Sequence, residues 1–485
     1  MNMRRIMDED ELYYNFIDNG MQEEVTKVTL PAVAVSYTAD AVKASNYNYT
    51  PATLSFFCMV GQLVKDMIAI PSGANIDDTR LQFLWLQTSG TGKSTLTNWY
   101  LPIVKEAFRL VNEKHGTEFD LFDITDYTDA ALIGSFEEQK EEVEDEDGRT
   151  RTVDVVVQVP GQLDGEGLAV WDEFEYSGIF KQSQHKENAI VYLNTFMNTL
   201  HGETWIISKK LKKGDEPIEC RCKRSIYATS YIPKTLTSVI TEKGVLQRLL
   251  TFIWEVPQDI QKNMRRQLIS DFGTITEREA PKLKYATALA KIYDAVKERY
   301  DEVGQDPMKV IRISPRAKDA LLRECILMEQ YIEHSRPEVF TAVETFINRI
   351  LKHIQKLAVL CAVAEAPSIS DKSKRFIVTA KNVEQAAYLV RQCYKSLVSW
   401  LDEALRVERQ AVAEQANIGV FKGIYNKMDK TEGWVHKALL LQEVRKHTKK
   451  SQATIYNWWK KGIEEHFEEK RIDKSAYIKL KEENK

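Results

Sequence analysis

The sequence has no long apolar run and no recognisable leader, and these two absences limit the kinds of protein it can be. A membrane-spanning helix needs about 20 mostly apolar residues, and no run of even about eighteen occurs in the 485 residues. Residues 1–11 are acidic and charged, unlike the basic and then apolar start of a signal peptide. We therefore expect a cytoplasmic protein with no membrane partner.

Cysteine is also scarce, and its placement does not suggest a metal site. The chain has six cysteines, and the one close pair, Cys220 and Cys222, lacks the second pair or the histidines that a zinc site needs. We expect all six to be reduced and structural, as is usual in the cytosol. Residues 1–50 read as a weakly patterned lead-in with no cluster of zinc ligands and no separate catalytic module.

The net charge of the whole chain is small, but the charge is unevenly distributed. The chain carries −4 at pH 7, yet residues 421–485 hold sixteen Lys and Arg against ten Asp and Glu. That region therefore carries +6, and the preceding residues carry −10. A local basic region favours a nucleic-acid partner even where the whole chain is acidic. The sequence predicts a basic module, residues 420–485, attached to an acidic body.

Residues 81–95 contain the strongest functional pattern: an apolar stretch, a glycine-containing loop and then a helix. The phosphates of a nucleotide need several backbone N–H donors, a helix N-terminus and one ammonium at the same place. Gly90 and Gly92 let the backbone approach closely. Lys93 supplies the positive charge, and Ser94 offers a hydroxyl to Mg²⁺. The predicted nucleotide-binding residues, named here the phosphate loop, are Thr88, Ser89, Gly90, Thr91, Gly92, Lys93, Ser94 and Thr95.

One position departs from the usual pattern of such loops. Gln87 stands where the first glycine of G-x-x-x-x-G-K-[S/T] is expected. That glycine relaxes the turn that leaves the strand, and several branches of these proteins do without it. A structural glycine-rich turn is the alternative interpretation. The apolar stretch before the loop and the helical spacing after it favour the nucleotide site.

Residues 167–174 form the second nucleotide element, an apolar strand that ends in adjacent carboxylates. ATP hydrolysis needs one carboxylate near Mg²⁺ and another that polarises the attacking water. We assign the first role to Asp172 and the second to Glu173. Such a pattern is common by chance, but it becomes specific at this distance after a phosphate loop.

Two further segments have a functional and a structural interpretation. Residues 137–148 are rich in Glu and Asp, and we interpret them as a solvated surface insertion rather than a metal site. Residues 205–222 alternate as a β-hairpin does. This hairpin is either a plain surface feature or, as we favour, a loop that grips a phosphodiester backbone. Its basic residues are Lys209, Lys210, Lys212 and Lys213.

Three polar residues complete the predicted catalytic set. Residues 224–231 form another apolar strand, and Thr229 and Ser230 near its end are placed to sense a γ-phosphate or water. Arg248 lies in a turn beside the next strand. An isolated arginine usually lies at the surface, but in a ring ATPase this one would neutralise charge on the phosphate of a neighbouring subunit's nucleotide.

The order of these elements resembles the AAA+ ATPase core of the replicative ring helicases, of the superfamily III and minichromosome-maintenance types. It is particularly similar to phage and plasmid primase-helicase proteins. Their pattern includes Thr-x-x-x-Leu before the acidic strand and Gly-x-x-x-Arg after it, and here these run from Thr128 to Leu132 and from Gly244 to Arg248. The resemblance covers roughly residues 31–255, about half of the chain.

The resemblance implies an α/β fold with a parallel sheet and flanking helices in residues 51–256. Three-four spacing of apolar residues predicts a helical region over 257–419, which fits the lid of such proteins, and residues 420–485 read as a winged-helix-like module. In ring helicases the hairpin projects into the central channel and tracks DNA, which implicates the four lysines. Thr229 and Ser230 stand where an Asn is often found, so the sensor position stays open. We do not assign Arg349, a candidate second sensor in the lid, to the nucleotide.

The basic module contains a predicted recognition helix. In residues 453–463 the residues Ile455, Trp458, Trp459 and Ile463 define a core face. Residues 471–480 match a wing. Binding to another protein subunit is the alternative, but the local charge favours nucleic acid. The candidate DNA-binding residues on the opposite, polar face and its margins are Gln452, Thr454, Asn457, Lys460 and Lys461.

These patterns together predict an ATP-driven DNA helicase of a phage or mobile element. It would use ATP and Mg²⁺ and act as a homo-oligomeric, hexameric ring on single-stranded or forked DNA in the host cytoplasm. Priming would belong to a separate primase or polymerase. One alternative is an ATP-dependent DNA-binding initiator or regulator without unwinding activity. Another is a scaffold that nucleotide locks together, against which the pair Asp172 and Glu173 argues.

Overall fold

The computed structural model forms two compact units, Met1–Leu401 (unit 1) and Asp402–Lys485 (unit 2), which are described separately. The division falls within one long helix, α15 (Ala380–Lys427). The structure describes residues 29–45, 49–73, 75–124, 128–144, 150–172, 174, 188–202, 205–210, 217–232, 244–270, 272–273, 279–333, 346–460, 462–473 and 475–481.

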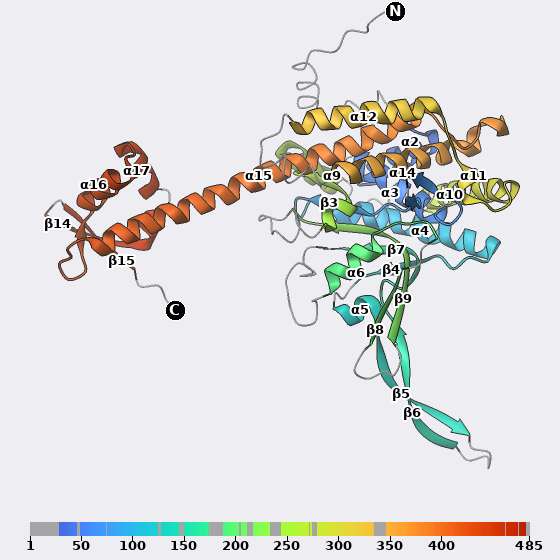
Figure 1. Cartoon of the computed structure of the whole chain (residues 1–485), viewed down its shortest axis with the longest axis horizontal. Helices are drawn as coiled ribbons and strands as arrows, with labels where there is room; N and C mark the ends of the chain where they lie inside the picture. Colours follow the sequence, from blue (N-terminus) through green and yellow to red (C-terminus); the bar gives the residue numbers. More distant parts are fainter. Residues whose placement is uncertain are drawn as a thin grey trace, which may run out of the picture. The chain divides into compact units, whose positions relative to one another are not determined.

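A mostly parallel β-sheet forms the centre of unit 1 (Figure 1). Five strands follow one another in the order β10-β3-β9-β7-β4 and are parallel to their neighbours. The sixth, β8, pairs with β9 in the antiparallel direction. The predicted α/β fold with a parallel sheet is therefore confirmed. The strands are β3 (Phe83–Gln87), β4 (Asp120–Asp123), β7 (Gly165–Trp171), β8 (Trp205–Lys210), β9 (Pro217–Ser230) and β10 (Leu250–Trp254).

Strands β3 and β10 are apolar because both of their faces are covered. All five residues of β3 and all five of β10 are buried, as expected of a parallel strand with helices on either side. The two strands that end the order differ from each other: β10 is buried throughout, whereas β4 has exposed aspartates at both ends, Asp120 and Asp123.

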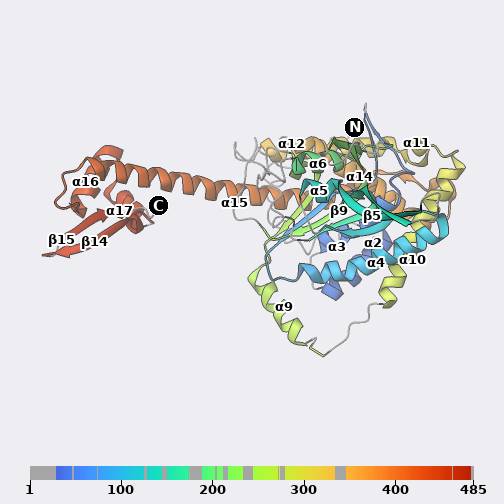
Figure 2. The same ribbon diagram turned by 90° about the horizontal axis from the view of Figure 1, so that it is seen from below.

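Long helices flank the sheet. Helix α4 (Lys93–His115) follows the phosphate loop and packs against α10 (Glu279–Glu302), and the two lie side by side in both views (Figure 2). It ends at Gly116, whose left-handed conformation lets its N–H bond the carbonyl of Asn112. Helix α3 (Tyr49–Leu63) is buried from Thr50 onward.

A long two-stranded ribbon, β5 (Gly134–Glu144) with β6 (Thr150–Pro160), projects from unit 1 (Figure 1). Its two strands pair antiparallel over all eleven positions. Residues 137–144 of the predicted surface insertion 137–148 thus belong to a regular β-ribbon, which the sequence analysis did not identify, and residues 145–148 lie outside the described residues. Glu137 and Glu138 are exposed on it, in agreement with a solvated surface.

The rest of unit 1 is mainly helical, including the described parts of the predicted helical region 257–419. A small parallel pair, β11 with β12, interrupts that region. The remaining elements of unit 1 are α2 (Ala32–Ser45), β1 (Ile70–Ser72), β2 (Asn75–Asp77), α5 (Asp129–Ile133), α6 (Ala189–Phe196), α8 (Val245–Arg248), α9 (Gln258–Ser270), α11 (Pro307–Val310), β11 (Arg312–Ile313), α12 (Pro315–Glu333), α14 (Ile347–Glu365), η2 (Ala366–Ser368), η3 (Lys372–Lys374) and β12 (Ile377–Val378).

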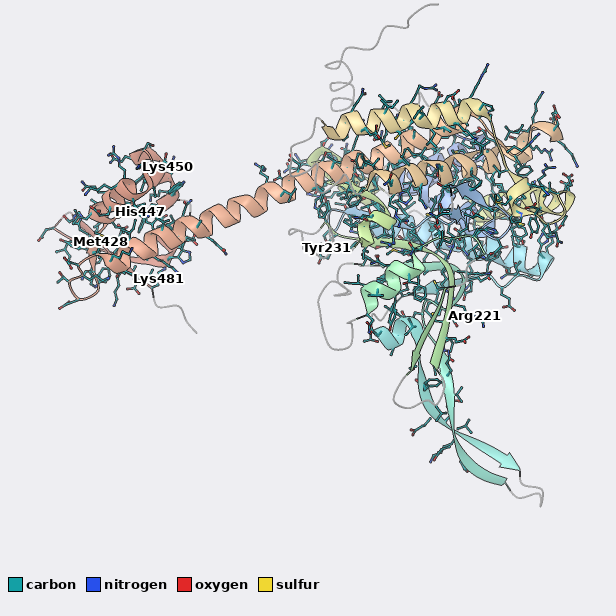
Figure 3. The ribbon with its side chains drawn as sticks, in the orientation of Figure 1. Arg221, Tyr231, Met428, His447, Lys450 and Lys481 are labelled. Carbon is teal, nitrogen blue, oxygen red and sulfur yellow. The ribbon has the colours of Figure 1, made fainter. Side chains whose placement is uncertain are left out.

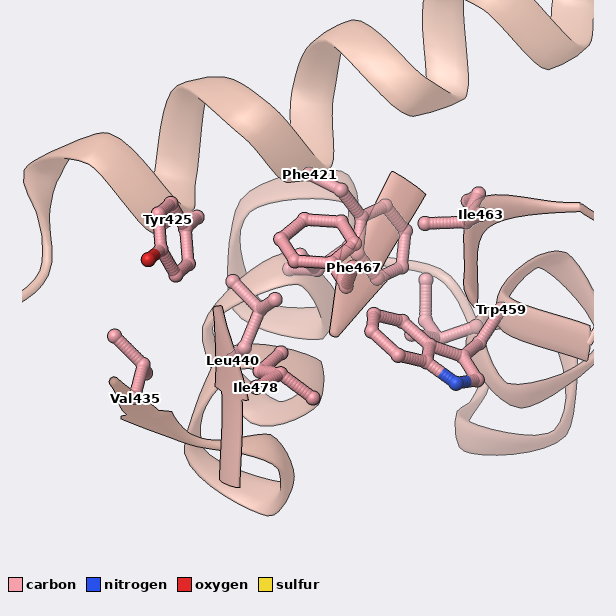
Figure 4. Close-up of a cluster of buried hydrophobic side chains, with 10 residues drawn as sticks. Phe421, Tyr425, Val435, Leu440, Trp459, Ile463, Phe467 and Ile478 are labelled. Atoms are coloured by element: carbon pink, nitrogen blue, oxygen red, sulfur yellow. The ribbon is translucent and has the colours of Figure 1, made fainter. Parts of the chain in front are cut away.

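Unit 2 packs the end of α15, two short helices and a three-stranded sheet of order β13-β15-β14 around one core. Figure 4 shows this core, where Phe421 and Trp459 come together from α15 and α17. The elements after α15 are β13 (Val435–His436), α16 (Lys437–Thr448), α17 (Gln452–Lys460), η4 (Ile463–His466), β14 (Phe467–Ile472) and β15 (Ser475–Leu480). Across the described residues of both units, every helix is too short or too polar to traverse a lipid bilayer.

Candidate nucleotide-binding site

The phosphate loop has the backbone geometry of an anion-binding turn. Gly90 and Gly92 have φ values of 70° and 82°, in the left-handed region that favours glycine. Helix α4 begins directly afterwards at Lys93, so its first N–H groups and its positive dipole end face the loop. Ser94 and Thr95 are exposed, and Lys93 is half-buried. The structure therefore places the predicted phosphate-binding groups together at the start of α4.

Gln87, the departure from the usual pattern, is an internal brace of this loop. Its side chain is completely buried, and its amide Nε2 donates to the Thr91 hydroxyl at 2.8 Å and to the Thr91 carbonyl at 3.2 Å. The Thr91 hydroxyl donates in turn to the carbonyl of Thr88 at 2.5 Å. The main-chain oxygen of Gln87 accepts from Lys93 Nζ at 3.2 Å. A glycine at this position would lack both amide bonds.

The second nucleotide element lies at the same edge of the sheet. Strand β7 ends at Trp171, and Asp172 follows it with an exposed side chain. The parallel register from β3 through β9 to β7 pairs Leu86 with Ser230 and Ala228 with Trp171. The carboxyl ends of all three strands therefore meet at one edge, which is where ligands bind to sheets of this kind.

The polar end of β9 supports Asp172. Thr229 and Ser230 are both buried, and the Thr229 hydroxyl donates to Asp172 Oδ1. In this structure Thr229 thus holds the carboxylate in place. That Thr229 or Ser230 also senses a phosphate or water remains a prediction.

The donors around Asp172 suit a magnesium ion that a nucleotide brings with it. Ser94 and Asp172 are exposed, and they offer one hydroxyl and one carboxylate. Within the described ranges no three His, Cys, Asp or Glu side chains come together as a metal site. Mg²⁺ is usually bound by one or two carboxylates, waters and substrate phosphates rather than by a complete protein cage. The donor set therefore fits Mg²⁺ carried by a nucleotide, with Glu173 lying outside the described residues.

Arg248 lies at the amino ends of the parallel strands, opposite to the phosphate loop. It is the last residue of α8, just before β10 begins, and the five residues of β10 span about 16 Å. The carboxyl end of β10 is the end near the phosphate loop, because Trp254 pairs with Gln87. Arg248 is therefore not brought to Lys93 of its own chain, and any role at a nucleotide requires a second copy.

The turn before Arg248 requires glycine. Gly244 has a φ of 73°, and a Cβ at that position would lie 2.7 Å from Arg248 Nη1. The arginine instead donates from Nη1 to the Gly244 carbonyl at 2.9 Å. The spacing Gly-x-x-x-Arg thus has a physical basis in this chain.

The basic hairpin is present, but its tip is outside the described residues. β8 and β9 pair antiparallel from Trp205 with Cys222 to Lys210 with Pro217. This confirms the predicted hairpin. Figure 3 labels Arg221, in the first half of β9, and Tyr231, beyond its carboxyl end, at opposite ends of the strand. The side chains of Lys209 and Lys210, and the whole of Lys212 and Lys213, lie outside the described part.

Unit 2 carries a polar and basic face on α17. Ile455 and Trp459 are buried in the core, as predicted. Ser451 accepts from the Thr454 N–H at 3.1 Å and so caps the start of the helix. Figure 3 shows His447 and Lys450 close to one another at the turn between α16 and α17. Of the candidate DNA-binding residues, Gln452, Asn457 and Lys460 are exposed, Thr454 is half-buried and Lys461 is outside the described residues.

Comparison with known proteins adds no family assignment. A scan against models of protein families found no match, and a search of curated proteins found no similar sequence.

Proposed function

We propose that this chain is an ATP-driven DNA helicase that works as a ring of identical subunits. The observation that carries the proposal is the meeting of the phosphate loop and Asp172 at one carboxyl edge of the parallel sheet. A phosphate loop alone would fit any nucleotide-binding protein. A carboxylate beside it, positioned by the Thr229 hydroxyl, fits hydrolysis.

In the proposed mechanism the loop N–H groups and Lys93 bind the β- and γ-phosphates. Ser94 and Asp172 would hold Mg²⁺, which neutralises phosphate charge when bound. Glu173 orients the attacking water and takes its proton. Arg248 of one subunit contacts the γ-phosphate bound to the next, because it lies too far from its own loop.

DNA binding is the second part of the proposal. The helix, strand and sheet order of unit 2 fits a winged helix, with α17 as the recognition helix and the β14–β15 turn as the wing. The lysine-rich hairpin would contact the translocating single strand. The net charge of +6 in residues 421–485 supports this assignment.

Purified full-length protein tests the proposal. We expect ATP hydrolysis that single-stranded DNA stimulates, and ATP-dependent separation of a forked duplex. Hydrolysis without unwinding would favour an initiator or regulator. Tight nucleotide binding without turnover would favour a scaffold and would contradict the catalytic assignment of Asp172 and Glu173.

A further inference from the structure

Helix α9 presents to solvent a basic face that also contains an isoleucine. The members of this face follow the three-and-four spacing that places residues on one side of a helix, and they are Lys262, Arg265, Arg266 and Ile269. All four are exposed, Ile269 to 76%. Neither arginine has an acidic residue three or four positions away, so neither can pair within the helix. The four residues are named here the basic face of α9.

The other side of α9 is the side that packs on unit 1. Ile260 and Met264, four residues apart, are half-buried. Gln261 Nε2 donates at 2.8 Å to a main-chain carbonyl just before the helix. Beyond the last turn, Phe272 has a side chain that is 92% exposed. The helix lies at the margin of unit 1 (Figure 2), so it is held on one side and uncovered on the other.

The β5–β6 ribbon has the opposite charge and an apolar face. Its two strands contain six Asp and Glu against two Lys and Arg, a net charge of −4. Alternation places Val155, Val157 and Val159 on one face of β6, and Glu137 lies directly opposite Val157 on that face. These four residues are named here the valine face. The valines are half-buried and Glu137 is exposed. Two strands alone are marginally stable in water, so a partner that covers the valines would stabilise the ribbon.

The two surfaces match in charge and in length. Helix α9 has three Lys and Arg against one Asp, a net charge of +2. Its thirteen residues span about 20 Å, and the eleven residues of one ribbon strand span about 37 Å. A helix laid on the face of a β-sheet is a common packing arrangement. Because Glu137 and the basic face of α9 are exposed in unit 1, they do not cover each other within one chain.

We propose that the basic face of α9 in one copy of this chain docks on the valine face of the β5–β6 ribbon in a second copy. In this contact Ile269 and Phe272 pack on the valines, and the arginines pair with ribbon carboxylates such as that of Glu137. The contact joins two different surfaces, so copies associate head to tail, into a closed ring or an open chain. The inference does not depend on nucleotide, so it can be tested separately from ATP hydrolysis.

Nucleic acid is the other partner that a basic face attracts. A phosphodiester backbone would account for the cations of α9. It would not account for the exposed Ile269 and Phe272 beside them, nor for an apolar face on an acidic ribbon. A second copy of the chain accounts for both surfaces, and we therefore favour it.

The first experiment measures self-association of the full-length protein without nucleotide, by analytical ultracentrifugation. Arg265→Glu with Arg266→Glu, the helix-acidic variant, should raise the Kd for association at least about tenfold, because like charges then face each other. Lys318→Glu with Arg323→Glu is the matched control, since both residues are exposed on α12. If wild type assembles and the helix-acidic variant assembles equally well, the inference is wrong and the ATPase proposal stands.

Mixing complementary variants tests whether the contact is between copies. Glu137→Lys with Gln139→Lys, the ribbon-basic variant, should also associate at least about tenfold more weakly. Glu138→Lys with Thr152→Lys makes the same charge change on the opposite face of the ribbon and should have a smaller effect. Equal amounts of the helix-acidic and ribbon-basic variants should associate with each other, because each contact between unlike copies then joins opposite charges. No association in the mixture, with both variants folded by circular dichroism, would overturn the inference.

The apolar part of the contact has its own variant. Ile269→Ser with Phe272→Ser should weaken association about tenfold, as for a truncated anchor at an interface, and leave the melting temperature unchanged because both side chains are exposed. Unchanged association would contradict the docking of these residues on the valines. If the helix-acidic variant instead keeps its association and loses affinity for single-stranded DNA, the partner is nucleic acid and the inference is wrong. A wild type that is monomeric with and without nucleotide would refute both this contact and the proposed ring.

Discussion

Polar residues at the carboxyl ends of the central strands differ in burial and pairing from those at the amino ends, which are called here the carboxyl edge and the amino edge. At the carboxyl edge Ser94, Thr95 and Asp172 are exposed, and the nearby loop is held by neutral hydrogen bonds such as those of Gln87. At the amino edge, just before β3, Asp78 and Arg80 are buried and joined as an ion pair. A buried charge needs its partner, because losing that partner leaves an uncompensated charge inside the fold, whereas an exposed charge remains available to a ligand.

Charge and burial therefore distinguish the residues of the carboxyl edge from those of the amino edge in unit 1. The carboxyl edge should respond to substitution mainly in ligand binding and turnover. The amino edge should respond mainly in stability, apart from Arg248. The following substitutions challenge that separation, beginning with the largest expected effect.

Lys93→Ala should produce the largest loss, because it removes the ammonium that we propose binds the nucleotide phosphates. We expect ATP turnover to fall ~10³-fold, equivalent to about 4 kcal/mol of transition-state stabilisation. The melting temperature should change little, since Lys93 is half-buried. Lys105→Ala, at an exposed position of the same helix, is the control. Retention of full activity in Lys93→Ala would remove the basis of the nucleotide assignment.

Asp78→Asn should mainly destabilise the fold. It leaves Arg80, which is 1% exposed, and the buried ammonium of Lys356 without their nearby carboxylate. Breaking a buried ion pair in this way costs about 3–5 kcal/mol. Chemical denaturation measures the loss in the free energy of unfolding. Under conditions where the variant is fully folded, its affinity for nucleotide should be unchanged.

The pH dependence of the stability difference between wild type and Asp78→Asn shows whether the charge of Asp78 causes it. Burial alone would raise the pKa of Asp78, but the charges of Arg80 and Lys356 lower it overall. A carboxyl with a lowered pKa in the folded state contributes stability above its unfolded pKa of about 3.9 and loses it as the pH falls. The gap between wild type and Asp78→Asn should therefore shrink below about pH 4. A gap that is the same at pH 3 and pH 7 would point to packing instead of charge.

Gln87→Gly should have an intermediate effect, although it restores the usual motif. The glycine removes two hydrogen bonds to Thr91, so we expect a loss of about 1–3 kcal/mol in stability. A less ordered loop should also weaken ADP binding severalfold, measured by calorimetry. Thr91→Val removes the other end of the brace, so the double variant should cost less than the sum of the single ones. Additive effects would show that the brace does not act as a unit.

The sequence predicted the features that depend on local pattern. The glycine-containing loop before α4 and the hairpin of β8 and β9 follow from apolar strands, turn residues and alternation, whereas the parallel sheet was implied by the resemblance. The core face of α17 follows from helical spacing at Ile455 and Trp459. In each case the residues that define the feature are neighbours in the chain, so their order contains the information.

The features that sequence reasoning missed depend on contacts or on a competing signal. The ribbon was missed because acidic residues in β5 suggested irregular structure, although Val153, Val155, Val157 and Val159 alternate in β6 as strand residues do. Gln87 was interpreted as a lost glycine, since its bonds to Thr91 follow from the folded loop.

The neighbourhood of Arg248 was inaccessible to sequence reasoning for a related reason. Its partners Asn198 and Asn194 are 50 and 54 residues earlier in the chain. Nothing in the spacing of these residues indicates that they meet. The expectation that Arg248 acts in another subunit was drawn from a resemblance, whereas its distance from its own loop follows from the strand order.

Lys460→Ala should give the smallest effect, because it removes one charge from an exposed helix face. Lys460 pairs with Glu464 at 3.4 Å, and an exposed pair of this kind contributes only ~0–1 kcal/mol, so the lysine is available to DNA. We expect duplex affinity to fall roughly threefold and the slope of log K against log salt to decrease by about 1, as for one phosphate contact. Lys318→Ala removes the same charge from an exposed site in unit 1 and should change neither. Equal effects of the two substitutions would mean that affinity follows net charge rather than the α17 face, and the assignment of unit 2 as the DNA-binding part would then be wrong.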